Sequence, residues 1–404
     1  MDNICKAGST FVSLFCIYGF FNCYSNALTV QNGMVTRLFH ILIFVYYIVA
    51  AWILHNWGAT LIQYVPIDGL CPEDTCELLL VYRLSFAIFT FHIILAAWLY
   101  GSFNSSDSRS IFQNRFWQLK FPLLLILIIL SGFIPESFFM YYGWVTFLGA
   151  IMFLLLQIFY IVDFSHTVIE CAINTADQIL YRSTYLPTIV IFSLSMLSIA
   201  IGLVVYMIFL LRELSDCHVN ILVIVLNMIV IVACAVASYH PKITEKNSSI
   251  GLFQLSVLAL FSTYLTWNAV IVDDPGQCTL SFIHQGPVYW ITVIIGTIFA
   301  LVVCIYSSIN ITTNDSESYN YSKTNSLFAL ATLYVAMLLT NWSVIRRYEG
   351  NEVETSLSWV PVVLDIFALI LLCIIYIWMA IAPAFFDNRD FRSIASKKDE
   401  DLPM

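Results

Sequence analysis

Charged side chains are scarce in this sequence, and their scarcity excludes most soluble folds. Asp, Glu, Lys and Arg make up 11% of the 404 residues, whereas apolar residues make up 60%. A soluble domain carries about 25% charged residues, because its water-exposed surface is built from them. A surface that faces lipid needs none. The composition therefore predicts an integral membrane protein.

Motifs of common catalytic machineries are also missing. No Gly-Lys dipeptide is present for a phosphate-binding loop, and no His-Glu pair begins a zinc-protease motif. No Gly-X-Ser-X-Gly sequence presents a nucleophile. Cysteines and histidines lack close metal-ligand spacing, and no run of Lys or Arg suggests nucleic acid. We therefore expect no enzyme activity, no cofactor, no metal site and no nucleic-acid partner.

Apolar segments of about 20 residues, the length that crosses a bilayer core, recur along the chain. Runs such as Phe121–Leu130 do not alternate apolar with polar residues, as strands of a membrane barrel do. The sequence thus predicts an all-α polytopic membrane protein with about ten transmembrane helices. These spans are expected near residues 35–57, 83–101, 119–135, 140–163, 186–211, 219–238, 251–271, 288–308, 325–345 and 360–384.

The ten spans define a transmembrane domain over residues 35–384, with segments 1–34 and 385–404 outside it. The apolar stretch Phe11–Val30 does not look like a cleaved signal peptide, because polar residues interrupt it. It could form an eleventh span, but we favour an interfacial or re-entrant segment. Residues 385–404 are expected to form a cytosolic tail.

Basic residues predict the orientation, because Lys and Arg favour the cytoplasmic side of a membrane. With a cytosolic N-terminus, the cytosolic loops receive all but four of the Lys and Arg residues, and both termini are then cytosolic. Five glycosylation sequons point the other way, since they fall in the same loops: Asn104, Asn247, Asn310, Asn314 and Asn320. Glycans at these sites would invert the predicted orientation.

Four cysteines fall in loops assigned to the lumenal or extracellular side, where disulfides persist. They are Cys71, Cys76, Cys217 and Cys278. Cys71 and Cys76 are close enough in sequence to pair, but sequence alone does not fix the connectivity. Free thiols in short loops are the alternative.

One helix is expected to be much longer than a bilayer is thick. No proline occurs between Pro135 and Pro187, and apolar residues 142–162 continue into good helix formers up to residue 179. A continuous helix over residues 142–180 would be about 57 Å long. Such a helix has to tilt steeply or project into the cytosol.

Three ionisable residues mark the cytosolic part of this long helix. Asp163, His166 and Glu170 lie three and four residues apart, so they share one face of the helix. They could form a polar track that meets lipid headgroups or a substrate amine. Alternatively, they are ordinary interfacial residues where the helix leaves the membrane.

Other ionisable residues lie inside or beside predicted spans, where charge is costly. Asp365 has apolar neighbours on both sides and is expected to pair with Arg83, Arg212 or a hydroxyl. Arg83 begins the second span, from which it could also extend to the interface. For His92, an interhelical hydrogen bond is favoured over a role in proton transfer.

Sequence segments in a fixed order resemble the serine incorporator (Serinc) family of eukaryotic membrane proteins. The resemblance covers roughly residues 60–392, and the order of its segments is more specific than any one of them. The segments are Val81-Tyr82-Arg83-Leu84-Ser85-Phe86-Ala87, Asn114-Arg115-Phe116-Trp117-Gln118-Leu119-Lys120, Ile134-Pro135, Ile161-Val162-Asp163-Phe164-Ser165-His166, His240-Pro241-Lys242-Ile243, Thr263-Tyr264-Leu265-Thr266-Trp267-Asn268, Leu339-Thr340-Asn341-Trp342, Ala382-Pro383 and Asn388-Arg389-Asp390-Phe391.

The resemblance implies ten helices in two bundles separated by one long tilted helix. It also implies either energy-independent phospholipid scrambling between leaflets or support for serine incorporation into phosphatidylserine and sphingolipids. The sequence departs from the family in a cysteine-poor N-terminal segment and a short loop, Ser308–Lys323. Motifs that animal members carry in that loop are therefore not transferred.

Passive lipid transport is the function that we favour from sequence. A groove between the two bundles would let a headgroup cross while its tails stay in hydrocarbon, with Asp163, His166 and Glu170 at its cytosolic mouth. The alternative is a membrane scaffold that recruits lipid-synthesis enzymes. A secondary transporter is less favoured, because most prolines lie at span ends and no inverted repeat is visible. Membrane lipids are the expected partners; homo-oligomers and the compartment (ER, Golgi, vacuole or plasma membrane) are left open.

Overall fold

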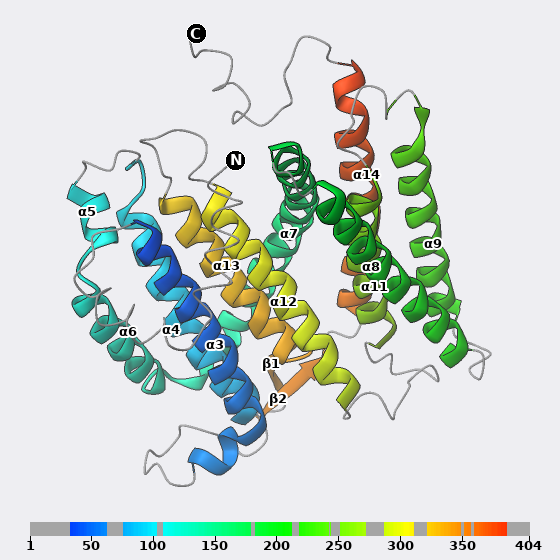
Figure 1. Cartoon of the computed structure of the whole chain (residues 1–404). Coiled ribbons are helices and arrows are strands. Elements are labelled where there is room, and N and C mark those ends of the chain that lie inside the picture. Colours follow the sequence, from blue (N-terminus) through cyan, green and yellow to red (C-terminus); the bar gives the residue numbers. More distant parts are fainter. Residues whose placement is uncertain are drawn as a thin grey trace, which may run out of the picture. The chain divides into compact units, whose positions relative to one another are not determined.

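The computed structural model describes residues 33–62, 76–102, 108–178, 182–211, 218–241, 243, 251–271, 287–310, 321–348, 351–356 and 359–385. Helices dominate this part of the chain (Figure 1). The helices are α3 (Gly33–Ile62), α4 (Cys76–Trp98), α5 (Ser108–Asn114), α6 (Trp117–Gly132), α7 (Glu136–Gln178), α8 (Arg182–Leu211), α9 (His218–Tyr239), α11 (Leu252–Ile271), α12 (Pro287–Asn310), α13 (Tyr321–Leu339) and α14 (Trp359–Phe385).

Eight of the described helices are long and apolar enough to cross a membrane. Two expected spans are helical but not among the eight. One of them, α6, has 16 residues, or about 24 Å at 1.5 Å per residue. The other, α11, carries buried polar side chains that lower its hydropathy: Gln254, Ser256, Ser262, Thr263 and Thr266. Helical spans are thus confirmed, while ten crossings stay a prediction.

The long helix expected from the absence of proline is confirmed. Helix α7 begins at Glu136, directly after Pro135, and runs without interruption for 43 residues. At 1.5 Å per residue it is about 64 Å long, about twice the roughly 30 Å of a bilayer core. Its tilt in the membrane stays a prediction.

A β-hairpin follows α13, and the sequence reading of a purely helical chain missed it. The ninth span was expected to reach residue 345, but α13 ends at Leu339. Asn341 and Trp342 adopt positive φ angles of 48° and 56°, and the Trp342 N–H donates to the Met337 carbonyl at 2.9 Å. This six-to-one bond around a left-handed residue terminates a helix.

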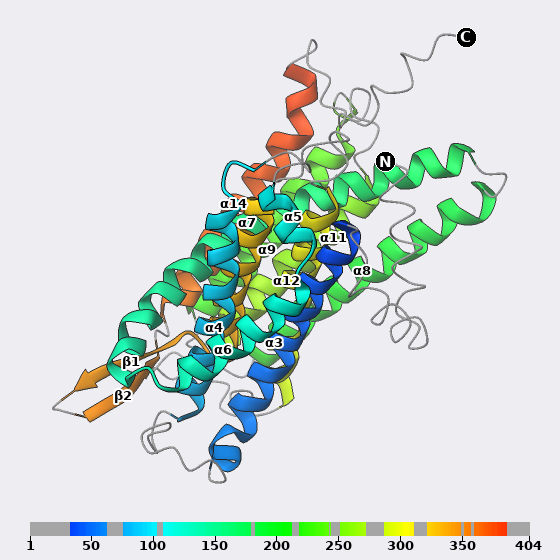
Figure 2. The same cartoon turned by 90° about the vertical axis from the view of Figure 1, so that its left-hand side faces the viewer.

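The hairpin pairs β1 (Ser343–Tyr348) with β2 (Asn351–Ser356) in antiparallel register, from Ser343 opposite Ser356 to Tyr348 opposite Asn351 (Figure 2). Its base is held by the Tyr82 hydroxyl of α4, which donates to the Ser343 carbonyl at 2.6 Å. Its strands are short and carry several charges, so a search for long apolar segments does not detect them.

The chain divides into two compact units, and each is described by itself. Unit 1 contains residues 155–295 and those from 358 onward; unit 2 contains residues 7–154 and 296–357. In unit 1, helices α9, α11 and α14 all pack on one another, and α8 covers α11 and α9. In unit 2, α3, α4 and α13 form a similar triangle, with α6 against α4.

Candidate functional site

Polar side chains meet in pairs inside the α9–α11–α14 triangle of unit 1. The Asn268 amide of α11 donates to Asp365 Oδ2 of α14 at 2.8 Å. The other pairs are Asn227 with Thr263 (Nδ2 to Oγ1, 3.4 Å), Cys234 with Cys373 (Sγ to Sγ, 3.9 Å) and Ser238 with Tyr376 (Oγ to hydroxyl, 2.6 Å). We call these four pairs the polar ladder.

Helical spacing explains why the polar ladder has one side on α9 and another on α14. Asn227, Cys234 and Ser238 are separated by seven and four residues, so they share one face of α9. On α14, Asp365, Cys373 and Tyr376 are separated by eight and three residues and also share a face. Both spacings are present in the sequence, but the predicted site did not include them.

The polar ladder extends along the helices rather than forming a single point. Asp365 and Tyr376 are eleven residues apart on α14, or about 16 Å along the axis. Most of its side chains are buried, but Asn268 and Cys373 are only partly so. Exposed apolar side chains occur elsewhere on the two helices, among them Val236 of α9 and Ile370, Ile374 and Trp378 of α14. The polar ladder therefore lies between helices whose outer faces suit lipid.

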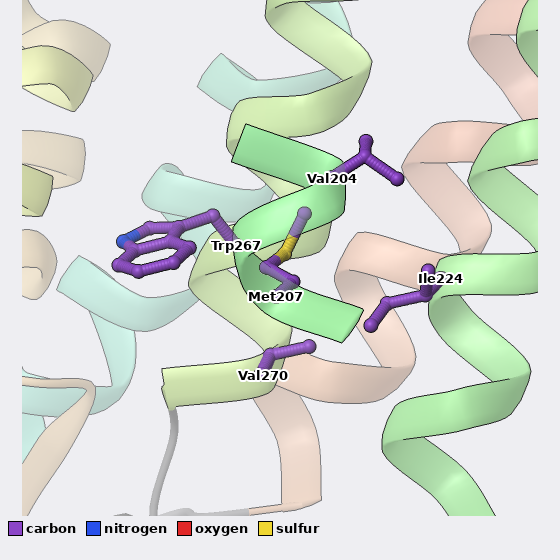
Figure 3. Close-up of a cluster of buried hydrophobic side chains, with 5 residues drawn as sticks. All are labelled: Val204, Met207, Ile224, Trp267 and Val270. Atoms are coloured by element: carbon purple, nitrogen blue, oxygen red, sulfur yellow. The ribbon is translucent and has the colours of Figure 1, made fainter. Parts of the chain in front are cut away.

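An apolar groove runs along the opposite side of α9. It has a volume of about 730 Å³ and is lined by Ile208 of α8 and by Ile221, Ile224, Val225, Met228, Ile229, Val232 and Ala233 of α9. Beneath it, a small hydrophobic core joins α8, α9 and α11 (Figure 3); its members are Val204, Met207, Ile224, Trp267 and Val270. Trp267 also donates from its indole nitrogen to Thr292 Oγ1 at 2.8 Å.

The residues predicted on the long helix are only partly brought into this site. The His166 ring lies 6.4 Å from the Tyr376 ring, between centroids, at one end of the polar ladder. Asp163 is half-buried on the same helix. Glu170 lies within α7, but its side chain is outside the described residues. The proposed track of three residues therefore stays a prediction. Of the three, His166 has a described contact with the polar ladder.

Asp365 and Arg83 have described partners other than each other, and Arg212, the other cationic partner expected for Asp365, lies outside the described residues. Asp365 accepts the Asn268 amide, a partner the sequence reading did not consider. Arg83 donates from Nη1 to the carbonyls of Ser131, Gly132 and Ile134 at 2.7, 2.8 and 3.0 Å. The Ser131 and Gly132 carbonyls end α6 and would otherwise lack intrahelical donors, and Ile134 follows shortly after the helix. Arg83 therefore caps that helix.

Unit 2 holds a second buried polar group, around two histidines. His92 Nδ1 lies 3.2 Å from Asn325 Oδ1, which is the interhelical hydrogen bond predicted between two spans. The His40 ring is 5.3 Å from the His92 ring, and Gln113 donates its amide to His40 Nε2 at 2.7 Å. These contacts join α3, α4, α5 and α13, so we assign them to packing of unit 2.

The cysteines divide into a disulfide class and a free class. Cys76 is disulfide-bonded, whereas Cys71, Cys217 and Cys278 lie outside the described residues, so the connectivity stays a prediction. Among cysteines whose side chains are described, Cys234, Cys304 and Cys373 are free. No group of three or more metal-ligating side chains occurs in the described residues.

Comparison with known proteins gives one consistent family. The profile of the family "Serine incorporator (Serinc)" matches residues 4–318 and 311–389. A "Probable serine incorporator" of Dictyostelium discoideum is 28% identical over 351 residues, covering 78% of this chain and 83% of its own. "Serine incorporator 2" of Homo sapiens is 26% identical over 371 residues, covering 77% and 79%. The "Membrane protein TMS1" of Saccharomyces cerevisiae is 28% identical over 319 residues, covering 76% and 62%. The chain is therefore a multi-pass membrane protein that belongs to the Serinc family.

Proposed function

We propose that this protein moves phospholipids between the two leaflets without ATP. The observation that carries the proposal is the polar ladder between α9, α11 and α14. We call the line along which α9 contacts α14 the α9–α14 seam. A phospholipid crosses a bilayer slowly because its charged headgroup has to leave water, at a cost of many kcal/mol. Side chains that offer hydrogen bonds along the way lower this cost.

The dimensions of the polar ladder suit this task. Its length of about 16 Å covers about half of the roughly 30 Å of hydrocarbon. On the other side of α9, the apolar groove has no charged or hydrogen-bonding side chain in its lining. A lipid whose headgroup follows the polar ladder can therefore keep its acyl tails in hydrocarbon or in this groove.

Access to the polar ladder requires the α9–α14 seam to open. Among the described side chains, one hydroxyl–hydroxyl bond and one thiol–thiol contact connect the two helices across it. An interhelical hydrogen bond in a membrane contributes about 0.6 to 2 kcal/mol. Thermal motion overcomes a bond of this size, so no nucleotide is needed. With the predicted orientation, the His166 end of the polar ladder faces the cytosol and the Asp365 end faces the lumen.

The test uses purified protein in liposomes that contain an acyl-labelled fluorescent phospholipid, with no ATP. We expect a quencher added outside to reach the inner-leaflet label in protein-containing vesicles but not in empty ones. Asn227→Leu removes one hydrogen-bonding side chain of the polar ladder. If the transition state loses about 1 kcal/mol of stabilisation, transfer slows about fivefold.

The matched control is Met228→Leu, the next residue of α9, which changes only the groove lining and should leave the rate unchanged. Asp163→Ala tests the predicted cytosolic mouth in the same assay. Label that stays protected in wild-type vesicles would refute the proposed transport.

A second candidate function is support for serine incorporation into phosphatidylserine and sphingolipids. The names of several relatives, which are called serine incorporators, favour it. In that case, deletion of the protein should lower labelling of these lipids from radioactive serine while leaflet asymmetry stays normal. Purification should also bring down lipid-synthesis enzymes. Normal serine labelling after deletion would reject this function.

A further inference from the structure

Asp365 is an acidic side chain in the membrane domain that has no cationic partner among the described side chains. It lies six residues into α14 and is 3% exposed. Its hydrogen-bond partner among the described residues is the neutral amide of Asn268. Ionisable side chains inside a membrane protein normally pair with one another or mark the path of a substrate.

The Asp365–Asn268 pair retains unused acceptors. A carboxylate has about four lone-pair sites on two oxygens, and the described bond occupies one site, on Oδ2. In the Asn268 amide, Nδ2 is the donor in that bond, which leaves its carbonyl oxygen as an acceptor. Asn268 is only partly buried. The pair thus presents acceptors beside an accessible surface.

A primary ammonium group matches this arrangement. It is a compact cation with three N–H donors, which two carboxylate oxygens and one amide oxygen can accept. A quaternary ammonium has no N–H donor, and proteins recognise it with aromatic cages instead. Phosphate is excluded, because it needs donors and positive charge rather than a carboxylate.

We propose that Asp365 and Asn268 form a binding site for a primary ammonium group at the lumenal end of the polar ladder. This inference rests on the proposed transport and names its preferred substrates: phospholipids with a primary amine in the headgroup, rather than choline lipids. The same chemistry is also present in free amino acids, so the experiment distinguishes these two sources.

The experiment measures bound lipid, so that it does not depend on transport. The full chain is placed in nanodiscs with equal amounts of phosphatidylethanolamine and phosphatidylcholine of identical acyl chains, then released and weighed by native mass spectrometry. We expect at least threefold enrichment of the ethanolamine lipid on the wild type. Asp365→Asn, which keeps the bond to Asn268 but removes the charge, should abolish the enrichment.

Three further variants make the result specific. Thr292→Val, which changes a polar contact elsewhere in unit 1, should keep the enrichment, and Asn268→Leu should reduce it even if Asp365→Asn fails to fold. Arg212→Gln tests whether an arginine outside the described residues is the counter-ion of Asp365. Loss of enrichment in Arg212→Gln equal to that in Asp365→Asn would overturn the proposal.

The source of the ammonium follows from a parallel binding measurement with radioactive serine. Lipid enrichment without serine binding assigns the site to headgroups, and serine binding that Asp365→Asn abolishes assigns it to the free amine. If the wild type shows neither lipid enrichment nor serine binding, the proposed site is refuted. A wild type that enriches the ethanolamine lipid but does not scramble refutes the transport proposal alone.

Discussion

A disulfide between Cys234 and Cys373 is expected to stop lipid transfer, because it would close the α9–α14 seam. The two sulfurs are 3.9 Å apart and both are free thiols. A disulfide bond is about 2.05 Å long, so the sulfurs have to approach by about 1.9 Å. Side-chain rotation with a small helix shift is sufficient. Diamide takes up the two thiol hydrogens and leaves the disulfide.

The expected fall in transfer rate follows from the contact that holds α9 to α14 in the reduced protein. The Ser238–Tyr376 bond contributes about 0.6 to 2 kcal/mol, which lowers the population of the open seam about 3- to 30-fold. A covalent bond between α9 and α14 cannot open in this way, so transfer should fall to the rate of empty vesicles.

The assay is the liposome quenching measurement, before and after diamide and again after reduction with dithiothreitol. Mass spectrometry of digested protein verifies the Cys234–Cys373 bond. Cys373→Ser should be insensitive to diamide, whereas Cys304→Ser, which changes a buried thiol of α12, should remain sensitive. Transfer at an unchanged rate by fully cross-linked protein would refute the role of the seam.

Two predictions concern stability, with substitutions in unit 2 and a control glycine in unit 1. A Cβ on Gly149 would overlap Leu333 Cδ1 and lie 3.2 Å from its Cβ, so Gly149→Ala should lower the free energy of unfolding by about 1 to 3 kcal/mol. Gly202 has open space, and Gly202→Ala should raise stability by up to about 1 kcal/mol; equal melting temperatures of the two variants in detergent would contradict this. Arg83→Met leaves three carbonyls without their donor, and each unsatisfied carbonyl costs about 1 to 3 kcal/mol. The folded monomer should therefore disappear from size-exclusion profiles of Arg83→Met. At the same temperatures, the control Arg83→Lys should retain part of it.

Local features of the fold were predictable, because they depend on one segment at a time. Hydropathy located the helices, and the absence of proline predicted the length of α7. The β1–β2 hairpin was missed because its strands are six residues each and carry Arg346, Arg347 and Glu354. A search for apolar segments treats such residues as loop.

The candidate site was predictable only in its ionisable members. Asp365 and His166 were recognised because charge inside a membrane is costly. Their partners Asn268 and Tyr376 are uncharged, and they become partners only because particular faces of α11, α14 and α7 meet. The acceptors of Arg83 were not predictable for the same reason, since backbone carbonyls leave no signal in a sequence.

The contacts of Arg83 also constrain how the chain is assembled. Its first acceptor, the Ser131 carbonyl, is 48 residues further along the chain, which a ribosome adds in roughly 2 to 10 s at about 5 to 20 residues per second. During this interval the guanidinium has none of the three oxygens that later bind it. We therefore expect helix α4 to remain at the translocon or near the headgroups until α6 has been made, so that the two segments are inserted together.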